Sequence, residues 1–199
     1  MIYSTNQNGT VYGEERVFAT KRGYISGHKY VDLELPSGTK WSMRNMGATQ
    51  EWEDGDFYAW GKLSPKDEYT SANCVTWNRE MNPPDISGNP EYDAVTANWC
   101  GSWRMPTESE VLELIDNCIW IWTTVSGVNS YRITAINGNS IFLPAAATPN
   151  NIEDLGTYWT STTEEMERGL AHFLLFGGST KRVVNNPRFN GYVIRLVSN

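Results

Sequence analysis

The amino-acid sequence predicts an α+β domain in which two helices pack on short twisted antiparallel sheets joined by long ordered loops. The main helix signal is a T-x-x-E capping box formed by Thr107 and Glu110. Apolar residues then recur at helical spacing, namely Val111, Leu114, Ile115 and Cys118. The strand signal is a series of short apolar runs separated by turn residues. A chain of 199 residues is long enough for one such domain.

The N-terminal segment, residues 1–27, is polar and rich in turn residues. It predicts an arm or strand extension ahead of a domain that comprises residues 28–199. Within the arm, the Asn-Gly pair at 8–9 is a hairpin turn signal between residues 1–5 and 10–18.

Residues 30–35 alternate apolar and polar side chains, and the Pro-Ser-Gly turn at 36–38 leads into residues 40–43, which predicts a hairpin. From 49 to 98, glycines and prolines interrupt every run before it reaches helix length, so long loops are expected. A short helix capped by Asp93 is predicted at 93–99. Aromatic side chains that could anchor the loops are Trp52, Phe57, Tyr58, Trp60 and Trp77.

The C-terminal half is predicted to be rich in strands. Residues 131–136 and 140–143 flank an Asn-Gly pair and predict a hairpin. Further strands are predicted at 171–176, 181–184 and 192–197. The Gly-Gly-Ser-Thr-Lys run at 177–181 lacks the residue order of a phosphate-binding loop and predicts a hairpin turn.

Charge and hydropathy exclude two classes of partner. The net charge of -7 argues against nucleic acid, since such partners require a basic surface. No apolar run approaches the ~20 residues that cross a bilayer, so no membrane span is expected. The start, MIYSTNQNGT, lacks the pattern of a secretory leader, which indicates either a protein that is not exported or a trimmed N-terminus.

Catalytic and metal-binding patterns are sparse. Cys74, Cys100 and Cys118 show no CxxC spacing; buried free thiols are favoured, and a bridge between the first two is the alternative. His28 and His172 lie in no known catalytic motif. A cluster of four acidic residues could ligate calcium but matches no EF-hand, so a solvated loop is expected: Glu51, Glu53, Asp54 and Asp56. No cofactor is implied.

Several segments, taken in order, resemble one family. They are GHKYVDLELPSGTKW (27–41), GDFYAWGK (55–62), ANWCGSWRMPTESE (97–110), LIDNCIW (114–120), NGNSIFLPAA (137–146) and YWTST (158–162). This ordered set is similar to the Fibrobacter succinogenes major paralogous domain, a family found in surface proteins of Bacteroides-type bacteria and their phages. The resemblance extends from about His28 to Val197. It implies a C-type-lectin-like fold, shared with formylglycine-generating enzymes and with the variable proteins of diversity-generating retroelements.

The resemblance also bears on single residues. It implies that Trp103 and Arg104 belong to the scaffold beneath the sheet and loops. Arg44 and Cys100 stand where Cys and Gly are common, and residues 194–197 replace the usual V-R-P-V, which indicates a diverged member. The sugar-binding triplets of the lectin relatives are absent, and all cysteines precede residue 119, unlike the reactive pair of the formylglycine-generating enzymes.

In the variable-protein relatives, turns of the C-terminal segment carry the ligand-facing residues. By that resemblance, Ala171, Phe173 and Leu175, or the residues that alternate with them, are scaffold. The candidate ligand contacts are Glu164, Glu167, His172, Arg182, Asn185, Asn186, Arg188, Asn190 and Tyr192.

Together these observations predict a non-catalytic domain that recognises a protein or glycan ligand from a bacterial cell surface or a phage virion. One alternative is an enzyme of the formylglycine-generating type. Another is a structural subunit at the tip of a fimbria or tail fibre, in which residues 1–27 would form a homo-oligomer with a neighbouring copy.

Overall fold

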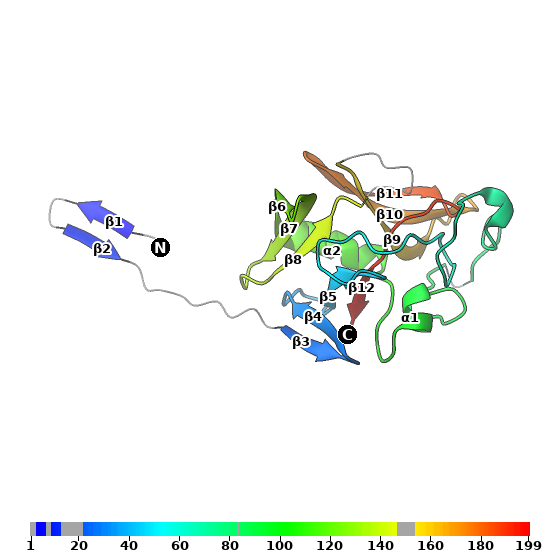
Figure 1. The fold of residues 1–199 in the computed structure, drawn as a ribbon, viewed down its shortest axis with the longest axis horizontal. Helices are drawn as coiled ribbons and strands as arrows, with labels where there is room; N and C mark the ends of the chain where they lie inside the picture. The colour runs from blue at the N-terminus through cyan, green and yellow to red at the C-terminus, as the bar shows by residue number, and fades with distance from the viewer. Residues whose placement is uncertain (1–2, 7–8, 13–21, 83, 147–153) are drawn as a thin grey trace.

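The computed structural model describes residues 3–6, 9–12, 22–82, 84–146 and 154–199 (Figure 1). In chain order its elements are β1 (Tyr3–Asn6), β2 (Gly9–Tyr12), β3 (Arg22–Ile25), β4 (His28–Asp32), β5 (Lys40–Asn45), the 3-10 turn η1 (Ser71–Asn73), α1 (Ala94–Asn98), α2 (Glu108–Asn117), β6 (Cys118–Val125), β7 (Val128–Ala135), β8 (Ser140–Pro144), β9 (Gly156–Thr163), β10 (Leu170–Gly177), β11 (Thr180–Pro187) and β12 (Arg195–Ser198). Two helices and several antiparallel sheets confirm the predicted α+β class.

The strands form separate small sheets, and every pair of named strands is antiparallel. One sheet has the order β12-β5-β4-β3, a second β11-β10-β9 and a third β6-β7-β8, while β1 and β2 pair only with each other. Helix α2 contacts β6 and all three strands of the second sheet. Figure 1 shows this helix among the three larger sheets. Its residues Val111 and Leu114 belong to the buried apolar cluster.

Four predicted hairpins are confirmed, and two strands are additional. β1 pairs with β2, β4 with β5, β7 with β8, and β10 with β11, the last across the Gly-Gly-Ser-Thr turn. Residues 13–18 of the first predicted hairpin lie outside the described part of the chain. Strands β6 and β9 were not predicted from the residue pattern.

The predicted boundary at residue 28 falls inside a hairpin. Arg22 to Ile25 pair with His28 to Val31, so β3 is the edge strand of the four-stranded sheet. Residues 22–27 therefore belong with this sheet, as a strand extension of the domain.

Buried tryptophans connect segments that are far apart in the sequence. Trp60, Trp103 and Trp159 are almost fully buried. Each indole N–H donates to a distant backbone carbonyl, at 2.9 Å for Trp60, 3.0 Å for Trp103 and 2.8 Å for Trp159. Their rings supply apolar area to the core while the polar tips stay hydrogen-bonded. This arrangement holds the long loops against the sheets, and it confirms Trp103 as scaffold.

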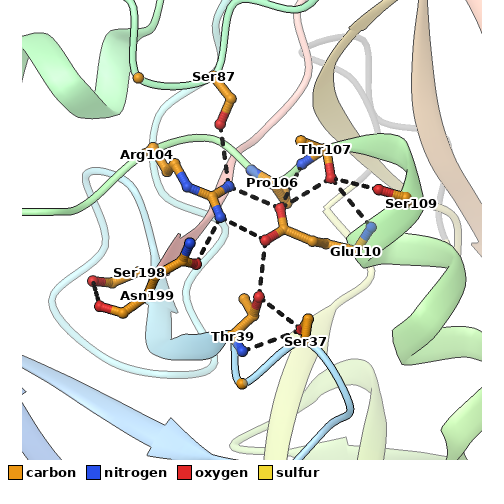
Figure 2. A network of polar contacts seen from close by, with 12 residues as sticks. Ser37, Thr39, Ser87, Arg104, Pro106, Thr107, Ser109, Glu110, Ser198 and Asn199 are labelled. Atoms are coloured by element: carbon orange, nitrogen blue, oxygen red, sulfur yellow. Dashed lines mark hydrogen bonds and ion pairs between the residues drawn. The ribbon is translucent and has the colours of Figure 1, made fainter.

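Arg104 is also a scaffold residue, and it joins the start of α2 to the loops around it (Figure 2). Its guanidinium forms a bidentate pair with the Glu110 carboxylate, at 2.8 and 2.6 Å. Glu110 completes the predicted capping box by accepting from the Thr107 backbone N–H at 2.8 Å. It also accepts from the Thr39 hydroxyl at 2.8 Å, while Arg104 donates to Asn199 at 2.8 Å. The helix cap is therefore tied to the residue before β5 and to the residue after β12.

A second arginine joins β12 to two neighbouring strands. Arg195 is 1% exposed and donates to the Asn45 side chain at 2.9 Å and to the backbone carbonyls of Ser42 at 3.0 Å and Phe142 at 2.6 Å. No carboxylate of a described residue pairs with it, and burial lowers its pKa to about 10. Its charge is thus held by neutral acceptors from β5 and β8.

Candidate functional site

Three of the predicted contact residues meet on one face of the sheet β9-β10-β11. His172 on β10 and Asn185 on β11 are directly paired across the two strands, and Glu164 follows β9 immediately. An Oε2 atom of Glu164 accepts from Asn185 Nδ2 at 2.8 Å and lies 3.2 Å from His172 Nε2. Strand register therefore brings these side chains together from positions that are up to 21 residues apart.

Glu108, the first residue of α2, lies on the other side of the imidazole. Its Oε2 atom is 2.7 Å from Nδ1 of His172. This is an ion-pair distance, but the contact does not have the geometry of a hydrogen bond. The ring thus lies between two carboxylates, and the side chains of His172 and Glu164 remain 19% and 21% exposed. A protonated imidazole donates from both nitrogens, whereas a neutral one donates from only one. Sequence reasoning missed Glu108, since its role depends on where α2 packs.

Glu164 is a hydrogen-bond acceptor that remains ionised at neutral pH. The backbone N–H of Met166, followed by the side chains of His172 and Asn185, lowers the pKa of Glu164 to about 2. Each of these donors favours the charged form of the carboxyl group. The site therefore presents a fixed negative charge and a histidine, which suits the binding of polar or cationic groups.

A groove of about 340 Å³ lies beside this cluster. One wall comes from the loop at residues 79–84 and the other from residues 163–168, with Glu164 in the second wall. Arg168 and Glu80 form an ion pair of 2.9 Å at this groove, and their side chains are 69% and 74% exposed. Such an exposed pair contributes about 0–1 kcal/mol, so a ligand can separate it at low cost.

The structure buries two of the predicted contact residues, Arg188 and Tyr192, although Arg188 also lines the groove. Arg188 is 2% exposed: Nε donates to the carbonyl of Leu170 at 3.0 Å, and Nη1 to those of Thr76 at 3.2 Å and Arg79 at 2.9 Å. Its guanidinium also lies 4.7 Å from the centre of the Trp60 ring. Two of the three guanidinium nitrogens of Arg188 are therefore hydrogen-bonded within the fold.

Tyr192 is the second buried residue, at 3% exposure. Its ring packs against Trp159 and Phe173, with centroids 4.5 and 4.6 Å away. Its hydroxyl accepts from the side-chain amides of Asn186 and Asn190, both of which are half-buried. These two asparagines therefore support the aromatic cluster, and ligand contact by them would require breaking those bonds.

The remaining predicted residues, Glu167 and Arg182, are exposed on the β9–β10 loop and on β11. Of the expected scaffold residues, Ala171 and Phe173 are buried beneath the same face, whereas Leu175 is half-buried and its neighbours Leu174 and Phe176 are buried. The candidate face therefore comprises Glu164, His172 and Asn185, with Glu108 beside them and the groove at its edge.

The acidic cluster and the cysteines considered in the sequence have other structural roles. Within the described residues, no group of three or more His, Cys, Asp or Glu side chains is placed to hold a metal ion. Glu53 instead accepts from the backbone N–H groups of Thr49 and Gln50, which stabilises a turn in the acidic loop. The three cysteines are free thiols, and Cys100 is exposed, contrary to the expectation that all three are buried.

Compared with family models, curated proteins and solved structures, the chain matches none. Neither described helix has both the length and the apolar character needed to cross a bilayer.

Proposed function

We propose that this chain is a non-catalytic recognition domain, displayed on a bacterial cell surface or a phage virion, that binds a protein or glycan ligand through the β9-β10-β11 face. The observation that carries the proposal is the Glu164–His172–Asn185 cluster beside an open groove. The more specific expectation of a C-type-lectin-like fold, drawn from the sequence resemblance, is part of the same proposal.

Two features support binding over catalysis. The cluster contains a carboxylate of low pKa and a histidine that contacts carboxylates on both sides, whereas nucleophilic catalysis needs a hydroxyl or thiol in contact with the base. Behind the cluster, Trp159, Phe173 and Tyr192 pack ring against ring. A rigid base of this kind lets surface loops vary without loss of the fold.

The test is an array of glycans and of host and bacterial surface proteins, probed with the full chain and with Glu164→Gln and Asn185→Ala. These changes remove the charge at half-buried Glu164 or a donor at exposed Asn185 and are expected to weaken binding by about tenfold, the value of one charge-assisted hydrogen bond. Glu91→Gln is the matched control, since Glu91 is an exposed carboxylate on another loop. Equal binding by all four proteins would reject the face.

A further inference from the structure

A second groove lies on the four-stranded sheet and shares no lining residue with the candidate face. It has a volume of about 350 Å³ and lies between the strands β3 to β5 and the loop at residues 49–52. This volume falls in the range of small-ligand sites. Two aromatic residues and two cationic residues line it, namely Tyr24, Trp52, Lys29 and Arg44.

The sheet wall of this groove is set by strand pairing. Tyr24 on β3 is directly opposite Lys29 on β4, and the Lys29 ammonium lies 5.9 Å from the centre of the Tyr24 ring. Met43 on β5 also lines the groove and adds apolar surface to it. The wall therefore combines an aromatic face, an ammonium group and a thioether.

The loop wall is held by polar contacts with its backbone. Arg44 Nη1 donates to the Thr49 carbonyl at 3.0 Å, and the Glu53 carboxylate accepts from the Thr49 N–H at 2.7 Å. These bonds fix the start and end of the segment that carries Trp52. Trp52 is half-buried, so part of its indole face stays available to a ligand.

Several polar side chains in this groove are free to bind a ligand. Neither Lys29 nor Arg44 forms an ion pair with a carboxylate of the described residues. Within the same residues, the Trp52 indole N–H and the hydroxyl of Tyr24, which is 66% exposed, have no hydrogen-bond partner. Among the lining residues, the cations Lys29 and Arg44 outnumber the one carboxylate, Glu51, by one positive charge. Outside the lining, the backbone N–H of Thr49 and, more weakly, the nearby charge of Arg44 lower the pKa of the Glu53 carboxylate.

We propose that this groove binds an acidic saccharide, with the carboxylate of a uronic-acid-type residue at Lys29 and Arg44 and the sugar ring against Trp52. An excess of one positive charge complements a monoanion better than the dianion of a phosphomonoester. Aromatic side chains with polar tips suit a ligand that has both an apolar face and hydroxyl groups. A planar guanidinium matches the geometry of a carboxylate.

Isothermal titration calorimetry on the full chain tests this, with methyl galacturonide, which carries a single carboxylate, as ligand and with the neutral methyl galactoside and inorganic phosphate as the other arms. The acidic sugar is expected to bind at least tenfold more tightly than either. Lys29→Met should weaken its binding by roughly tenfold, since one charge-assisted contact is lost. Trp52→Leu should do the same by removing the stacking surface.

Lys181→Met is the matched control, because the Lys181 ammonium lies 5.8 Å from the Trp120 ring centre in the same kind of contact but outside the groove. Its binding should stay within twofold of the parent chain. The proposal is overturned if the neutral sugar or phosphate binds as tightly as the acidic sugar, if no sugar binds, or if Lys29→Met and Lys181→Met behave alike. The proposal is also overturned if Glu164→Gln loses binding and Lys29→Met does not, since that result would place the ligand at the β9-β10-β11 face.

Discussion

Replacing Arg104 by methionine should destabilise the fold through the carboxylate that it leaves behind. Arg104 and Glu110 are joined by two short hydrogen bonds, and their side chains are only 18% and 11% exposed. Removing one partner of a buried ion pair costs about 3–5 kcal/mol. Because some exposure remains, we expect a loss of about 3 kcal/mol, which corresponds to a fall in Tm of roughly 6–12 °C for a chain of this size.

Urea unfolding followed by tryptophan fluorescence measures this loss, and the double variant Arg104→Met/Glu110→Met completes a mutant cycle. The double variant should lose at least about 1 kcal/mol less than the sum of the single variants, since it leaves no unpaired charge. Arg168→Met is the matched control, because Arg168 pairs with Glu80 at 2.9 Å with both side chains exposed. Arg168→Met should change the free energy of unfolding by no more than about 0.5 kcal/mol.

The pH dependence of the difference in unfolding free energy between the parent chain and Arg104→Met gives a second test. Burial alone would raise the pKa of Glu110, but hydrogen bonds from Arg104 and from the Thr107 N–H lower it overall. The stabilisation by a carboxylate of lowered pKa is fully present above its unfolded pKa of about 4.3 and is lost as the pH falls through the folded value. The difference between the parent chain and Arg104→Met should therefore shrink below about pH 4. The reasoning would be refuted if the stability losses of Arg104→Met and Glu110→Met simply add in the double variant. It would also be refuted if the stability difference between the parent chain and Arg104→Met does not change with pH.

Three further predictions concern other groups. Arg188→Met should lower the free energy of unfolding by about 3 kcal/mol in urea unfolding, since three hydrogen bonds from a buried guanidinium to backbone carbonyls are lost, while Arg182→Met at an exposed position should change it by less than about 0.5 kcal/mol. The carboxyl carbon of Glu164 should titrate in NMR with a midpoint near 2, and a midpoint near the ordinary value of about 4.3 would contradict its hydrogen bonding. In the native chain a thiol reagent at about pH 8 should label exposed Cys100 before Cys118, because burial and then a nearby carboxylate raise the pKa of Cys118 to about 11; the reverse order would contradict the packing.

The elements that could be predicted are those with complete local signals. The capping box at Thr107 and the turn pairs between strands act over a few neighbouring residues, and the structure places helix α2 and four hairpins there. β6 follows α2 without an intervening turn residue, so its start had no such signal. The end of β6 did have a turn signal, the Ser126-Gly127 pair. Both residues have positive φ and form the turn into β7. β9 is buried at nearly every position, so it lacks the alternation by which a half-exposed strand is recognised.

The site was harder to predict than the fold because it depends on packing between distant segments. Glu164, His172 and Asn185 meet through strand register, which a correct strand assignment makes predictable. Arg188 looks like a surface residue in the sequence, and its burial depends on carbonyls that are as much as 112 residues away. Tyr192 likewise has a polar tip, but its ring completes an aromatic cluster. Residue type alone could not separate these two from true surface residues.

Strand β12 has a consequence for how the protein is made. Its residues Leu196 and Val197 belong to the two different clusters of buried side chains, and Arg195 bonds to partners 150 and 153 positions earlier in the chain. During translation, β12 is synthesised after every strand that it joins. Until β12 emerges, apolar surface of the two clusters stays uncovered. The final cooperative step of folding therefore follows the emergence of β12.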